Sequence, residues 1–92
     1  MDAARAVIER RHGVARDDYQ VSLDMRACEG VVQLRGVMPC VASFIHRELT
    51  DLVRESSVGT LNYVRETSVR RVVDEPPWDF VLRWKPGKYM AY

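Results

Sequence analysis

The chain has 92 residues and a formal net charge of +1. This length allows one small domain, which buries roughly 60–70% of the surface of its unfolded chain. Hydrophobic residues make up 47% and charged residues 29%, a composition that excludes a disordered chain. The near-neutral charge argues against a dedicated nucleic-acid-binding protein, which normally carries a strong basic excess. The sequence has no apolar run of about 18 residues, the length that predicts a membrane-spanning helix.

The first third of the chain predicts a helix followed by a β-hairpin. Residues 2–11 place apolar side chains on one helical face, and the glycine that follows is a typical stop signal. Residues 19–25 alternate apolar and polar side chains, which is the pattern of a half-buried strand. A short turn over 27–30 leads to a second strand over 31–37, so we expect the two strands to pair antiparallel.

The central stretch changes from strand to helix periodicity at Pro39, a residue that fits the first turn of a helix. From there the apolar residues recur at helical spacing and form one stripe. The stripe consists of Val41, Phe44, Ile45, Leu49, Leu52 and Val53. Because each large side chain contributes about 1.5–3 kcal/mol when fully buried, a charge at Phe44 or Leu49 is expected to unfold the domain.

The last third contains two extended stretches separated by a break at 74–77. Residues 60–73 are rich in β-branched side chains. Their apolar positions change phase, so we expect either a bulge near Arg65–Glu66 or two separate strands. Residues 78–84 alternate again and have a large apolar face, and Pro86-Gly87 is expected to end this strand.

This order of elements predicts an α+β fold. The simplest architecture is an αββαβ sandwich with two helices on one face of a small mixed sheet, plus a C-terminal extended strand. We expect residues 1–73 to form the αββαβ domain. Residues 74–92 are then a proline-bounded extension that is rich in aromatic and basic residues.

The second predicted strand has a Gly, a Val, a Leu and a Gly at alternate positions, namely Gly30, Val32, Leu34 and Gly36. This pattern resembles the signature hairpin strand of the BON domain, a family named for bacterial osmotically induced and nodulation-related proteins. The resemblance covers about residues 2–70 and implies an αββαβ fold. It also implies a non-enzymatic domain that binds phospholipid surfaces or other proteins, often in the bacterial envelope.

The sequence contains no catalytic, cofactor-binding or metal-binding pattern that we can identify. Glycine-rich phosphate loops and the common hydrolase and metalloprotease motifs are missing. His12 and His46 have no ligand partner at helical spacing, so a zinc site is not expected. Cys40 has no base beside it and is expected to be an inert small residue. We therefore expect no enzyme activity, cofactor, metal, small-molecule substrate or nucleic-acid partner.

Cys28 and Cys40 are expected to be free thiols. In the predicted hairpin they lie at opposite ends of the second strand, more than about 20 Å apart at about 3.3 Å per residue. A disulfide needs Cα atoms within about 7 Å. Free thiols favour a reducing compartment, and the N-terminus has no signal-peptide pattern. The compartment stays open: cytoplasmic if the chain is complete, periplasmic or envelope if it is an excised domain.

The strongest candidate for partner binding is the aromatic and basic C-terminal stretch. Its residues are Trp78, Phe80, Leu82, Trp84, Arg83, Lys85 and Lys88. Three roles fit this pattern. The aromatic side chains could fill the domain's own core, or they could pack on another copy or a partner by strand addition or aromatic anchoring. In the third role, the tryptophans and lysines lie at a membrane interface.

Two functions are compatible with these features. The first is a non-catalytic binding module of BON type for phospholipid or envelope surfaces or for partner proteins. The second is an oligomerisation or scaffold domain, similar in plan to ring-building domains of secretion systems, which assembles through edge strands and the Trp78–Trp84 face. Both functions lead us to expect a protein partner or self-association, with a membrane surface as a further partner.

Overall fold

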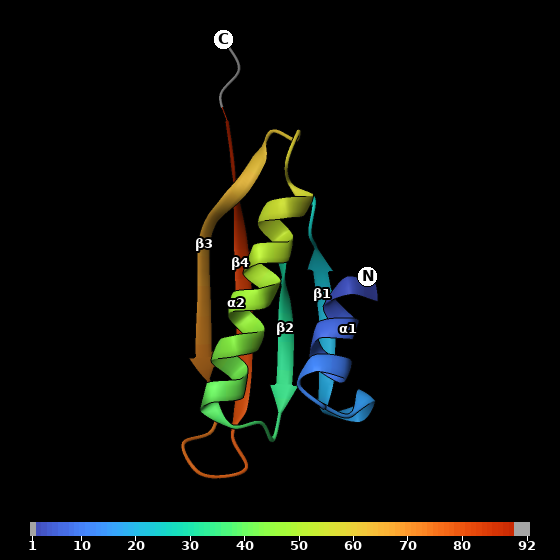
Figure 1. Cartoon of the computed structure of the whole chain (residues 1–92). Helices are drawn as coiled ribbons and strands as arrows, with labels where there is room; N and C mark the ends of the chain where they lie inside the picture. The colour runs from blue at the N-terminus through green and yellow to red at the C-terminus, as the bar shows by residue number, and fades with distance from the viewer. Residues whose placement is uncertain (1, 90–92) are drawn as a thin grey trace.

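A computed structural model describes residues 2–89 as a four-stranded sheet with helices against one face (Figure 1). The strands are β1 (Tyr19–Asp24), β2 (Glu29–Arg35), β3 (Asn62–Arg71) and β4 (Asp79–Lys88). The helical segments are α1 (Asp2–Ala6), a π-helical turn that continues it (Val7–Arg11), a 3₁₀ turn (Arg16–Asp18) and α2 (Pro39–Ser56). The predicted α+β class, with both helices on the same face of a small sheet, is confirmed.

The strands lie in the order β1-β2-β4-β3. β1 and β2 form the predicted hairpin, in which Val21 is opposite Val32. β4 pairs with β2 on one side and with β3 on the other, and all three pairings are antiparallel where a mixed sheet was expected. The arrangement follows from the chain path, because β3 and β4 form a second hairpin whose returning strand lies beside β2.

The C-terminal stretch is an integral part of the sheet. The expected boundary between residues 73 and 74 falls in the connection between the two strands of the β3–β4 hairpin. The expected extension instead supplies β4, which lies between β2 and β3. The reason is its large apolar face, which gains most by burial at the centre of the sheet.

The core lies between the sheet and the helices. α2 buries Ala42, Ile45, Leu49 and Val53 against the sheet. The remaining buried apolar residues come from the N-terminal helix, β1, β2, β4 and the loops, and none comes from β3: Ala4, Val7, Ile8, Val14, Tyr19, Leu23, Cys28, Val32, Leu34, Val37, Phe80, Leu82 and Trp84. This cluster, contributed by residues 4–84, joins the N-terminal helix, α2 and the strands β1, β2 and β4 in one packing unit.

Phe44 departs from the predicted stripe. It is 54% exposed, whereas Leu49 is fully buried. Successive helical residues are about 100° apart, so Phe44 lies about 100° from Ile45 and about 160° from Ala42. The buried face of α2 is centred between Ile45 and Ala42, and Phe44 therefore points to solvent. The expectation that a charge at Phe44 unfolds the domain is wrong for this reason.

The glycine of the first hairpin has a packing role that the sequence pattern did not indicate. Gly30 is the second residue of β2, opposite Leu23. A Cβ atom at this position would lie 2.4 Å from the carbonyl oxygen of Ser22, which is too close for any side chain. The preceding turn is closed by Asp24, whose Oδ1 accepts the backbone N–H groups of Arg26 and Ala27, each at 3.1 Å. Local packing thus explains one residue of the BON-like pattern.

β3 and β4 deviate from regular pairing at one place. Val64 is opposite Pro86 and Glu66 is opposite Lys85, so Arg65 is an extra residue. This is the bulge predicted near Arg65–Glu66. β4 continues through Pro86 and Gly87 to Lys88, whereas the sequence predicted that it would end there. The proline is tolerated because β2 pairs with β4 only as far as Trp84, and the missing N–H lies beside the bulge.

Candidate functional site

The seven candidate residues of the C-terminal stretch do not form one surface. Phe80, Leu82 and Trp84 lie beneath α2, with 4%, 0% and 2% of their surfaces exposed. In this fold they are core residues and cannot contact a partner, which corrects the expectation that they bind one. Of the three roles considered from the sequence, core packing applies to this aromatic face.

The other four candidates are distributed over the molecule. Trp78 is partly buried ahead of β4, where its indole N–H donates to the carbonyl oxygen of Asp74 at 3.3 Å. The Arg71 guanidinium lies 5.9 Å from the centre of its ring. Arg83 and Lys85 are exposed on the opposite sheet face, since strand side chains alternate, and Lys88 is exposed where β4 ends. These four side chains therefore have no common target.

The sheet face away from the helices is uncovered by other elements and carries both signs of charge. A hollow of about 660 Å³ on this face is lined by residues of β1, β2 and β4. Within it Arg83 and Lys85 accompany Asp24 and Glu29. Such a mixture of charges does not select an anionic or a cationic ligand.

A polar network links α2 to β4 and β3. Trp84 Nε1–H donates to Thr50 Oγ1 at 3.0 Å, and Thr50 donates to the carbonyl oxygen of His46 at 2.7 Å. The His46 ring stacks on Trp84 with centroids 5.4 Å apart, and its Nε2 contacts Thr67 Oγ1. Thr67 donates its hydroxyl proton to the carbonyl oxygen of Arg83, so His46 Nε2–H is the donor to Thr67. Burial lowers the pKa of His46 below its ordinary value.

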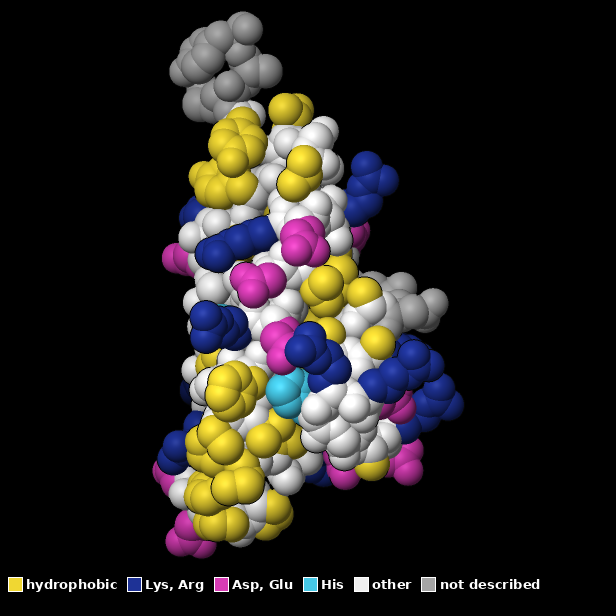
Figure 2. All heavy atoms as spheres, in the orientation of Figure 1, with side chains coloured by type: hydrophobic (Ala, Val, Ile, Leu, Met, Phe, Trp, Pro, Cys, Tyr) yellow, Lys and Arg dark blue, Asp and Glu magenta, His cyan; other side chains and the backbone are white. Residues whose placement is uncertain are grey.

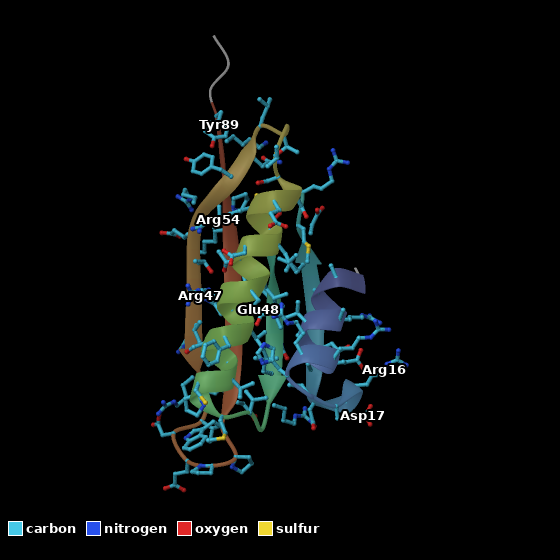
Figure 3. All side chains as sticks on the ribbon, in the orientation of Figure 1. Arg16, Asp17, Arg47, Glu48, Arg54 and Tyr89 are labelled. Atoms are coloured by element: carbon cyan, nitrogen blue, oxygen red, sulfur yellow. The ribbon has the colours of Figure 1, made fainter. Side chains whose placement is uncertain are left out.

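A second ionisable cluster joins the N-terminal helix to α2. Glu48 lies 3.0 Å from an Arg11 guanidinium nitrogen and 3.1 Å from His12 Nε2. In Figure 3 Glu48 points from α2 toward the N-terminal helix, whereas Arg47 lies on the β3 side. Both partners of Glu48 come from the end of the N-terminal helical segment, whereas Glu48 is on α2. The cluster therefore holds these two segments together.

The described residues lack two other kinds of site. Within residues 2–89 no three His, Cys, Asp or Glu side chains are grouped to hold a metal ion. None of the described helices is long and apolar enough to cross a membrane. Cys28 is buried, Cys40 is exposed, and both are free thiols.

An apolar patch is exposed where α2 begins and β3 ends. Its members are Met38, Phe44, Val69 and Val73, with 60%, 54%, 38% and 39% of their surfaces exposed. The contact of His46 with Thr67 holds α2 beside β3. Next to it, the N–H of Val37 donates to the carbonyl oxygen of Trp78 and so joins the loop before α2 to the connection between β3 and β4. Figure 2 shows apolar atoms gathered over this end of the molecule. We call this surface the α2–β3 patch.

A second apolar patch lies at the opposite end of the sheet. Tyr63 and Tyr89 pack with ring centroids 4.8 Å apart, and the N–H of Tyr89 donates to the carbonyl oxygen of Leu61 at 2.9 Å. Val58, Leu61 and Tyr89 are 80%, 63% and 60% exposed. Figure 3 places Tyr89 at this end and Arg54 nearer the middle of the molecule, on the β3 side of α2. We call Val58, Leu61, Tyr63 and Tyr89 the tip patch.

The outer edge of β3 is not paired with another described strand. β3 is ten residues long, is the last strand of the sheet, and is exposed from Arg65 to Arg71. Along it Thr67 and Val69 face the helices, because their register partners Trp84 and Leu82 do. Glu66, Ser68 and Arg70 face the uncovered side.

Comparisons with protein-family models, with curated proteins and with solved structures find no match for this chain.

Sequence reasoning located the strands that make these surfaces but not the surfaces themselves. Most of the residues predicted to bind a partner were the apolar residues of 78–84, although their alternation with polar residues is also the pattern of a core strand. The signal for the β3 edge was present in its composition. Six of the seven residues from Arg65 to Arg71 are charged or carry a hydroxyl group, and they occur on both faces of the strand, which is typical of an edge.

Proposed function

We propose that this chain is a non-catalytic assembly domain of BON type, which joins copies of itself through the side formed by β3 and α2. The observation that carries the proposal is the exposed edge of β3. An unpaired strand edge presents N–H and C=O groups that a strand of another molecule can pair with. Strand addition of this kind is a recurrent mode of protein recognition.

The α2–β3 patch supports the same surface. Contiguous apolar side chains on a small protein mark interaction sites more often than singly exposed ones do. Val69 belongs both to this patch and to the edge strand, so the strand edge and the apolar surface are continuous. Burial of the apolar side chains of the α2–β3 patch against a second molecule would add to the association free energy, which hydrogen bonds between strand edges alone would not supply in full.

The BON-like pattern supports the same class of function. Gly30, Val32, Leu34 and Gly36 resemble a family whose domains bind proteins or phospholipids. The β1–β2 hairpin that carries this pattern is formed as expected. The resemblance implies the element order αββαβ. The present chain has this order from α1 to β3 and then adds β4.

The assembly function is tested by measuring molar mass by sedimentation velocity from about 1 μM to 1 mM, a range that covers Kd values of that span. The wild-type chain should exceed the monomer mass as its concentration rises. Val69→Asp should remain monomeric, because it places a charge in the α2–β3 patch. Val58→Asp, a matched change in the tip patch, should assemble as the wild type does.

Thermal unfolding of both variants shows whether each still folds. A wild-type chain that stays monomeric at every concentration contradicts the assembly function. Equal loss of assembly in Val58→Asp and Val69→Asp would remove the α2–β3 side from the proposal.

The tip patch favours a second candidate function, attachment to a phospholipid surface. Exposed aliphatic and tyrosine side chains suit the boundary between headgroups and acyl chains. Arg54 lines the same hollow as Val58 and Tyr89, and Lys88 precedes Tyr89, so cations accompany the apolar residues. Co-sedimentation with vesicles should then require anionic lipid and be weakened by Val58→Asp but not by Val69→Asp. Absence of binding to anionic vesicles contradicts this candidate.

A further inference from the structure

We infer that the assembly partner is a second copy bound through β3 in one specific register, antiparallel and centred on Ser68. This inference rests on the proposed function and specifies how it is carried out. A two-fold axis perpendicular to the sheet at Ser68 would join the two sheets into one, with the helices of both copies on the same face. Each β3 would then fill the unpaired edge of the other.

Charge complementarity selects this register. With the axis at Ser68, Glu66 lies opposite Arg70 of the second copy, and the symmetry repeats the pair. Both side chains point to the uncovered face, because Glu66 is opposite Lys85 in β4 and Arg70 is opposite Val81. Oppositely charged residues directly across two strands stabilise pairing, and like charges there destabilise it.

The two charged groups are available for this contact. Among the described side chains, Glu66 has only long ion pairs, 3.6 Å to Lys85 and 3.7 Å to Arg65. Arg70 makes no ion pair with any side chain among residues 3–89 and is exposed. A carboxylate can accept several N–H donors at once, so Glu66 can bind a second cation.

The neighbouring registers lack this match. Moving the axis to Thr67 brings Glu66 opposite Ser68, and moving it to Val69 brings Glu66 opposite Val72. An axis at Glu66 itself places the two carboxylates together. The other edge of the sheet cannot form such a pair either, because Asp24 is the only charged residue of β1.

The helix-facing side of the same register is also compatible. Thr67 lies opposite Val69 of the second copy, and the pair occurs twice around the axis. β-branched side chains pack well against each other across strands. This contact would cover Val69, which is 38% exposed in the single chain.

One like-charge pair limits the paired length. Arg65 would come opposite Arg71 of the second copy. Arg65 lines a second hollow, on the β3 side of the uncovered face, together with Glu66 and Lys85. Arg71 instead packs near Trp78 and is opposite the buried Phe80. The two guanidinium groups are therefore on different faces, and the pairing should extend over residues 66–70.

The register is tested by charge exchange on the whole chain, with association measured by sedimentation. Glu66→Arg and Arg70→Glu should each weaken self-association by about 10- to 100-fold, since two symmetric pairs change from attraction to repulsion. An equimolar mixture of the two variants should regain association as a heterodimer, because both cross-pairs are again Arg with Glu. The double variant should also associate with itself.

Matched controls are available on β2. Glu29→Arg and Arg35→Glu make the same charge changes at exposed positions away from β3, and they should associate like the wild type. Circular dichroism of each variant verifies that it is folded, and the mixture keeps the test valid if one variant is less stable. The two single variants have opposite net charges, whereas the double variant keeps the net charge of +1, so self-association of the double variant cannot arise from a change in net charge.

Each result has one interpretation. Loss in both single variants with recovery in the mixture and in the double variant supports the register, and loss without recovery in the double variant overturns it. Wild-type assembly that persists in both single variants overturns the register and leaves the assembly function standing. A wild-type chain that is monomeric throughout overturns both.

Discussion

The two edges of the sheet are built differently. β1 has six residues, and two of its side chains, Tyr19 and Leu23, are buried. β3 has ten residues, and its last seven are exposed. The N-terminal helix contributes Ala4, Val7 and Ile8 to the common core with β1, whereas beyond β3 the described chain has no further element (Figure 1).

This difference separates an edge that is held by the core from an edge that remains exposed. An edge whose side chains are buried is held by the core and has little freedom to accept another strand. An edge whose side chains are exposed contributes little to the stability of its own domain and is free to bind. β3 is attached to the core chiefly through its pairing with β4 and the contact of Thr67 with His46.

Truncating one apolar residue on each edge would show the largest contrast. Leu23→Ala on β1 should lower the free energy of unfolding by about 2–5 kcal/mol, because the side chain is 4% exposed and its loss leaves a cavity. Val69→Ala on β3 should cost less than about 1 kcal/mol, as for exposed positions generally. Urea unfolding of the dilute protein measures both values. Equal costs would contradict the distinction between the edges.

A smaller effect concerns the polar link between β3 and α2. Burial holds the pKa of His46 below the value of about 6.5 that histidine has in an unfolded chain. Between these two pKa values the unfolded state binds more protons than the folded state. The free energy of unfolding should therefore fall as the pH is lowered from about 6.5 toward the folded pKa, and it should be unaffected by His46 above about pH 7.

Replacing the imidazole isolates this effect. His46→Gln keeps an N–H donor for Thr67 but cannot be protonated in this range. Its free energy of unfolding should change less with pH between about 7 and 5 than that of the wild type, as measured by urea unfolding at a series of pH values. The same pH dependence in both proteins would assign the effect to other groups.

The sequence predicted the helices and strands better than it predicted which strands pair with each other. The β1–β2 hairpin, α2 and the bulge at Arg65 each have a local signal, either a change of period or a change of phase. Local signals say nothing about which strand occupies the space beside β2. The position of β4 depends on pairing between residues about fifty apart, such as Gly30 with Trp84.

The candidate site was harder to predict for a related reason. Trp78, Phe80, Leu82 and Trp84 have the composition of both a core strand and a binding surface. Only the position of β4 decides between these roles. Phe44 shows the reverse error, because its spacing fits the apolar stripe while the centre of the buried face lies on the other side of Ile45.

The central position of β4 also has a consequence for biosynthesis. The N-terminal residues leave the ribosome first, yet β2 cannot gain its inner neighbour until residue 84 has been made. The nascent domain therefore has an incomplete sheet until β4 has left the ribosome, and its cooperative folding is expected to wait for that strand. Folds dominated by such distant pairings acquire their structure slowly, and intermediates with exposed strands are prone to aggregate.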